Sequence, residues 1–177
     1  MISNKMAEAL NKHMNLELFS ANIYLSMSSC ANDMGFKGSA NWFMAQYQEE
    51  MVHFMKFYNY LIEQGINISI LASEAVPNEY SSLLDMFTKT LAHEQLITSC
   101  INELTEQAVQ EKDHATQIFL QWFVTEQIEE ENNDRDILAK LKIVGENGHG
   151  LLMVDNELGQ RVFAAPPEGT SPFPSAA

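Results

Sequence analysis

The segment Gln48-Glu49-Glu50-Met51-Val52-His53 places a glutamate and a histidine three residues apart, in a stretch whose apolar side chains recur at helical spacing. Residues three apart lie on one face of a helix, so Glu50 and His53 share the apolar face that carries Phe57. A lone pair of this kind is common, and it is ordinarily a surface glutamate beside a hydrogen-bonded core histidine. The rest of the chain decides between that interpretation and a buried polar site.

Six polar residues interrupt the apolar stripes of four predicted helices at two repeating intervals. Within each half of the chain, 33 residues separate the acid of the first helix from the polar pair of the second, and 77 residues separate each residue from its counterpart. The chain therefore looks like two helical hairpins, each with an acid on its first helix and an i, i+3 polar pair on its second. The residues are Glu17, Glu50 and His53 in the first half, and Glu94, Gln127 and Glu130 in the second.

The charge of this set predicts a metal site. A buried carboxylate without a partner is costly, and four that converge would also repel one another. No lysine or arginine falls on the same stripes. Two divalent cations would neutralise the four glutamates, with His53 and Gln127 as neutral ligands. The pattern is typical of a binuclear metal site inside a four-helix bundle.

The kinds of ligand narrow the choice of metal. Carboxylates with a single imidazole and no thiolate favour iron or manganese over structural zinc or Cu(I). The two metal positions should also be unequal. The first would use Glu17, Glu50 and His53, whereas the second would share Glu50 and add Glu94 and Glu130. Gln127 would then lie near the second position or bind it weakly, and open coordination positions would remain for dioxygen or peroxide.

Further residues lie beside the predicted site. Tyr24 follows Glu17 by two helical turns, so it is either a core tyrosine or a hydrogen-bond partner or electron donor beside the metals. A second acidic group contains Glu49, Glu126 and Glu129 and shares Glu130; it is either a solvated helix face or a third, weaker iron position. The remaining histidines have no such company and are expected to be ordinary: His13, His93, His114 and His149.

Periodicity predicts an all-α chain. Between the second and third helices, residues 66–80 resist a helix yet could reach along most of a long bundle, so they are expected to form one long crossover. Ser82 with Asp85 resembles a capping box, and Asp113 is expected to cap the fourth helix. The third helix is expected to bury Leu84 and Phe87. The predicted helices span about residues 4–33, 39–64, 81–110, 114–144 and 151–159, the last being short.

Composition sets the outer limits. With a net charge of −14 and a pI of about 4.6, the chain should attract cations and repel nucleic-acid backbones, so no nucleic-acid partner is expected. Cys30 and Cys100 are expected to be reduced, and no signal peptide or membrane-spanning run is evident, which predicts a cytoplasmic protein without a membrane partner. Residues 1–160 are expected to form one domain. Residues 161–177 are expected to form a flexible, proline-rich tail.

Four longer motifs give the chain a specific resemblance. Over about residues 3–160 it resembles the bacterial non-haem ferritins of the ferritin-like di-iron family. The resemblance implies a ferritin-like four-helix bundle with one long crossover and a short fifth C-terminal helix. The motifs are Met14-Asn15-Leu16-Glu17-Leu18, Gln48-Glu49-Glu50-Met51-Val52-His53, Glu94-Gln95-Leu96-Ile97-Thr98 and Phe119-Leu120-Gln121-Trp122 with its continuation to Glu131.

The same resemblance implies a ferroxidase that oxidises Fe(II) with dioxygen or hydrogen peroxide and stores ferric mineral inside a homo-oligomeric shell of 24 subunits. It assigns the iron pair to Glu17, Glu50, His53, Glu94 and Glu130. It also assigns a third iron to Glu49, Glu126, Glu129 and Glu130, and the family's tyrosine to Tyr24. Bacterioferritins carry Glu-x-x-His on the fourth helix, whereas this chain has Gln127-x-x-Glu130, so no haem is expected.

Other function classes remain to be weighed against an iron-oxidising enzyme. A shell that stores iron passively would bind the metals without turnover. A DNA-protecting mini-ferritin would place its metals between subunits, which the strong negative charge and the intrachain ligand set oppose. A rubrerythrin-like peroxidase would carry further paired cysteines, which this chain lacks. A helical signalling bundle would have no reason to bury these acids.

Overall fold

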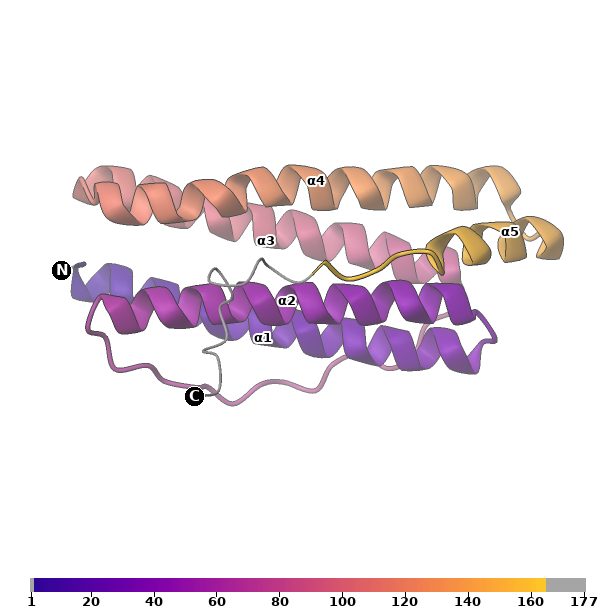
Figure 1. Cartoon of the computed structure of the whole chain (residues 1–177), viewed down its shortest axis with the longest axis horizontal. Helices are drawn as coiled ribbons and strands as arrows, with labels where there is room; N and C mark the ends of the chain where they lie inside the picture. Colours follow the sequence, from indigo (N-terminus) through magenta and orange to yellow (C-terminus); the bar gives the residue numbers. More distant parts are fainter. Residues whose placement is uncertain (1, 165–177) are drawn as a thin grey trace. The chain divides into compact units, whose positions relative to one another are not determined.

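The computed structural model describes residues 2–164, which contain five helices and no strand (Figure 1). Within this range no helix combines the length and the apolarity that a membrane span requires. The chain divides into two compact units, residues 10–79 with 155–164 and residues 2–9 with 80–154. The helices are α1 (Asn4–Asp33), α2 (Lys37–Glu63), α3 (Leu83–Glu111), α4 (His114–Val144) and α5 (Gly148–Leu158).

The first unit is built on an antiparallel hairpin of α1 and α2. Its pairing is marked at one end by Ser28, whose hydroxyl donates to the Ala40 carbonyl at 2.8 Å. One turn further in, the rings of Tyr24 and Phe43 stack with centroids 6.4 Å apart, and both side chains are fully buried. Apolar residues at helical spacing thus form a continuous seam between the two helices.

The start of α2 depends on a residue far along the chain. Phe36, at the N-cap position, supplies no side-chain hydrogen bond to the first turn. Instead, the buried carboxylate of Asp155 accepts from the amides of Gly38 (3.0 Å) and Ser39 (2.6 Å), and from the Ser39 hydroxyl (2.7 Å). The exposed amides of a helix N-terminus favour an anion, so Asp155 acts as a cap in trans.

Residues 66–82 form the long connection between α2 and α3, without helix or strand. Asn11 and Ser69 exchange hydrogen bonds of 3.0 and 2.8 Å near the start of α1. Further along α1, Ser26 donates to the Pro77 carbonyl at 2.7 Å. The connection therefore follows α1 along most of its length, as a long crossover does.

The second unit is built on the antiparallel hairpin of α3 and α4. The Ser82 hydroxyl accepts from the Asp85 amide at 3.1 Å, and the Asp85 carboxylate accepts from the Ser81 amide at 3.0 Å. The predicted capping box is therefore present, although its return bond goes to the residue before the cap. Lys112 takes a left-handed conformation between the helices, and Asp113 caps α4 by accepting from the Thr116 amide.

Some boundaries and one core assignment differ from the sequence predictions. Helix α2 begins two residues earlier than expected, α3 two residues later and α5 three residues earlier. Leu84, predicted to be inward, is 38% exposed, whereas Leu83 is buried. Leu83 lies 11 residues, or about three turns, before the buried Glu94, so the two residues share one face of α3. Leu84 lies ten residues before Glu94, which places it roughly 80° away from that face.

The predicted proline-rich tail falls mostly outside the described residues, because residues 165–177 are not described. Residues 161–164 are described and contain neither helix nor strand. Cys30 and Cys100 are both free and half-buried.

Candidate metal centre

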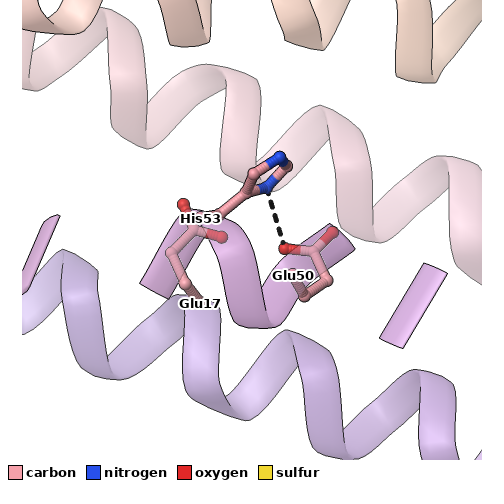
Figure 2. Close-up of side chains that lie close together, drawn as sticks. All are labelled: Glu17, Glu50 and His53. Atoms are coloured by element: carbon pink, nitrogen blue, oxygen red, sulfur yellow. Dashed lines mark hydrogen bonds and ion pairs between the residues drawn. The ribbon is translucent and has the colours of Figure 1, made fainter. Parts of the chain in front are cut away.

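The first hairpin brings together three of the predicted ligands. Glu17 lies in the middle of α1, and Glu50 and His53 lie one turn apart on α2. One ligand atom from each lies within 4.8 Å of the others, and the residues are 1%, 2% and 4% exposed. His53 Nδ1 lies 3.2 Å from Glu50 Oε2, and Figure 2 shows the three side chains converging. Two carboxylates and one imidazole thus lie close enough together to coordinate one metal ion.

A fourth side chain touches this group. His13 lies one turn before Glu17 on α1, and its Nε2 lies 2.7 Å from Glu17 Oε1. The His13 ring is buried and packs against Phe57 of α2 with centroids 4.8 Å apart. The packing fixes the imidazole beside one oxygen of the carboxylate.

These neighbours decide the charge of Glu17. Burial alone raises the pKa of its carboxyl, but the opposing effects of His13 and His53, with a smaller one from Glu50, leave the pKa below its ordinary value. The group is therefore a carboxylate at neutral pH. An anion in this position is ready to bind a cation without first losing a proton.

The site has the properties that a divalent cation would satisfy. Apart from the contact with His13, neither oxygen of Glu17 accepts a hydrogen bond of ordinary geometry from residues 2–164. No lysine or arginine is buried in that range. Oxygen ligands with one imidazole suit iron and manganese, so the residues fit the metals predicted from the sequence.

The second hairpin carries the other predicted ligands. Glu94 of α3 and Gln127 and Glu130 of α4 are all buried. The Gln127 amide donates to Glu94 Oε2 at 3.0 Å and to the Glu94 carbonyl at 3.2 Å, and it also approaches the Thr98 hydroxyl at 3.4 Å. In this geometry Gln127 holds Glu94 in place with its amide group.

The residues predicted beside the site have different surroundings. Tyr24 is fully buried in the α1–α2 seam. Glu126 is half-buried and Glu129 exposed on α4. Glu49 is half-buried on α2 and forms an ion pair with Arg161, which follows α5. One member of the second acidic group, Glu49, is therefore paired with a positively charged side chain.

His13 was expected to be an ordinary histidine, yet it lies against Glu17. The signal was present, because His13 and Glu17 are four residues apart on one helical face and His13 lies on the stripe that contains Leu10 and Met14. A histidine four residues from a glutamate is also common on solvated helices. Only the burial of both residues gives the pair its significance.

Comparison with known proteins agrees with this geometry. The model of the ferritin family, described as a ferritin-like domain, matches residues 7–144. The chain belongs to the ferritin-like family.

Among its relatives is a probable bacterial non-heme ferritin-like protein of Haemophilus influenzae. It is 45% identical over 159 residues, which cover 90% of this chain and 96% of the relative. The bacterial non-heme ferritin of Escherichia coli O157:H7 is 42% identical over 158 residues, 89% of this chain and 96% of the relative.

Solved structures agree. The open pore ferritin of the archaeon Archaeoglobus fulgidus has a TM-score of 0.90 and 46% sequence identity, and the match covers 92% of this chain and 100% of that one. The predicted fold class, an all-α ferritin-like four-helix bundle with a long crossover and a short fifth helix, is therefore confirmed.

Proposed function

We propose that this chain is an iron-storing ferroxidase. It binds Fe(II) in pairs, oxidises it to Fe(III) with dioxygen or hydrogen peroxide, and keeps the ferric mineral inside a shell of 24 identical subunits in the cytoplasm, without haem. The observation that carries the proposal is the buried group of Glu17, Glu50 and His53 in a chain of the ferritin-like family. The names of the relatives, bacterial non-heme ferritins, support the storage role.

The electrons balance over an iron pair. Two Fe(II) ions give one electron each. Dioxygen takes these two electrons and two protons to become hydrogen peroxide, and hydrogen peroxide takes two of each to become two waters. A pair of substrate ions held side by side supplies both electrons in one event, which is why two adjacent positions are proposed.

Each residue has a proposed role toward the iron substrate. The first position uses Glu17, Glu50 and His53. The second shares Glu50 and adds Glu94 and Glu130. The roles of the other residues are secondary: Gln127 orients Glu94, Tyr24 donates a hydrogen bond or an electron, and Glu49, Glu126 and Glu129 with Glu130 hold a third, weaker iron.

The test is iron oxidation by the assembled protein. Aerobic Fe(II) is mixed with wild type and with Glu17→Gln, and ferric absorbance is followed by stopped flow. We expect wild type to oxidise more than two irons per subunit faster than the uncatalysed reaction, and Glu17→Gln to lose most of the rate. Glu8→Gln is the matched control, because Glu8 is an exposed acid on the same helix.

The alternative left open by the sequence is passive storage. Wild-type protein that binds Fe(II) but oxidises it no faster than buffer would refute the ferroxidase proposal and leave a binding shell. A Glu17→Gln variant with wild-type rates would contradict the assignment of the first iron position.

A further inference from the structure

The segment that follows α5 is held against α2. The Asn41 side-chain amide donates to the Arg161 carbonyl at 2.8 Å and approaches the Gly159 carbonyl at 3.4 Å. The guanidinium carbon of Arg161 lies 4.4 Å from the centroid of the Trp42 ring. A hydrogen-bonded backbone and a stacked side chain together fix where the charge of Arg161 lies. In Figure 1 this segment is the yellow coil beyond α5.

The positive charge of Arg161 lies beside the Glu49 carboxylate. Arg161 Nη2 forms an ion pair with Glu49 Oε2, two turns along α2 from Trp42. The two side chains are 19% and 25% exposed, so water screens the pair only partly. A guanidinium carries its donors in a planar fork that matches the geometry of a carboxylate, so Arg161 suits Glu49 as a partner.

Arg161 and a metal ion would compete for the same carboxylate. Both require its oxygens, and a divalent cation within coordination distance of Glu49 would lie beside a fixed positive charge. The like charges repel, so the guanidinium disfavours a cation at the oxygen with which it pairs. Arg161 also lies beyond residues 7–144, the segment that the family model matches.

We propose that Arg161 is a resident counter-cation that withholds Glu49 from metal binding, so that iron reaches this carboxylate only by displacing the guanidinium. The inference rests on the proposed function in one respect, the assignment of Glu49 to an additional iron position. In this chain the additional position therefore binds iron weakly, and the segment after α5 sets its affinity for iron. The first iron position, at Glu17, Glu50 and His53, is independent of this contact.

The experiment is an anaerobic Fe(II) titration of the full-length assembled protein by isothermal calorimetry. Wild type, Arg161→Gln, Glu49→Gln and the Arg161→Gln/Glu49→Gln double variant are compared. We expect Arg161→Gln to bind Fe(II) at Glu49 at least about tenfold more tightly than wild type, and the double variant to lose that event. Arg135→Gln is the matched control, because Arg135 is the other arginine of the chain and pairs with Glu131.

Three results would overturn the inference. The first is Glu49-dependent binding of equal affinity in wild type and Arg161→Gln, and the second is no Glu49-dependent binding in Arg161→Gln. In either case Arg161 only ties down the segment that follows α5. An affinity gain of the same size in Arg135→Gln would also overturn it, because a general change of charge would then be the cause.

The proposed function is decided separately in the same titration. The iron bound by Glu49→Gln reports the pair site alone, and its absence would refute the ferroxidase centre. The difference between Arg161→Gln and the double variant would still decide the role of Arg161.

Discussion

Replacement of Gly38 by alanine should release the cap that Asp155 places on α2. A Cβ at position 38 would lie 1.7 Å from the Asp155 carbonyl oxygen, whereas ordinary contacts begin at 3.4 Å. The two backbones must therefore separate by well over an ångström. Hydrogen bonds of 3.0 and 2.6 Å from the amides of positions 38 and 39 to the Asp155 carboxylate cannot survive that shift.

The expected size follows from these bonds. A hydrogen bond to a charged group contributes about 1.5–3 kcal/mol, so the two amide bonds together contribute roughly 3–6 kcal/mol. Alanine returns up to about 1 kcal/mol through its higher helix propensity. The opening free energy of the first turn of α2 should therefore fall by about 2–5 kcal/mol. At 1.4 kcal/mol per factor of ten, this is roughly a 30- to 4000-fold loss of protection.

Hydrogen–deuterium exchange measures this loss directly at positions 38 and 39. Gly148→Ala is the control, because Gly148 is also a helical glycine but a Cβ there meets nothing within 4 Å. Protection that falls less than threefold in Gly38→Ala, or equally in both variants, would refute the trans cap. It would show that Asp155 contributes nothing measurable to the start of α2.

Three more predictions concern single side chains. His13→Leu should weaken anaerobic Fe(II) binding about 10- to 100-fold, because the contact that orients Glu17 is lost. His13→Gln keeps a donor and should bind Fe(II) more tightly than His13→Leu. Unchanged binding isotherms in both variants would contradict this role of His13. Glu130→Ala should weaken the second iron position more than the first in the same titration, whereas equal losses at both would contradict the unequal pair. Asp85→Asn should cost about 0.5 kcal/mol in chemical unfolding at pH 7. A hydrogen bond from Lys89 is the largest cause that lowers the pKa of Asp85. The contribution of Asp85 to the free energy of unfolding is therefore complete above the ordinary pKa and vanishes as the pH falls through the lower folded-state pKa. A difference in stability between Asp85→Asn and wild type that persists in acid would contradict this.

Much of the hairpin architecture was predictable because it is local. The Ser82 and Asp113 caps follow from residues within a few positions of each boundary, and the long crossover follows from the length of the non-helical segment 66–80. The one misplaced core residue, Leu84, reflects an error in helical phase rather than a tertiary effect. Since 11 residues make about three turns, the spacing to Glu94 already favoured Leu83.

The features that were not predicted depend on residues distant in sequence. Gly38 gave no sign that Asp155, 117 residues away, would lie against it. Arg161 was expected to begin a flexible tail, and nothing near it in sequence indicates the contact with Glu49. Composition and periodicity describe which face a side chain occupies, but not which distant partner that face meets.

The sequence by itself determined the helices, their apolar faces and the recurrence of acids on those faces, because helical geometry turns spacing into direction. Only the tertiary structure decided that His13 contacts Glu17, that Asp155 caps the N-terminus of α2 and that Arg161 forms an ion pair with Glu49. Each of these depends on a buried or half-buried charge and its partner. Burial sets how much such a pair matters, and burial is a property of the folded chain.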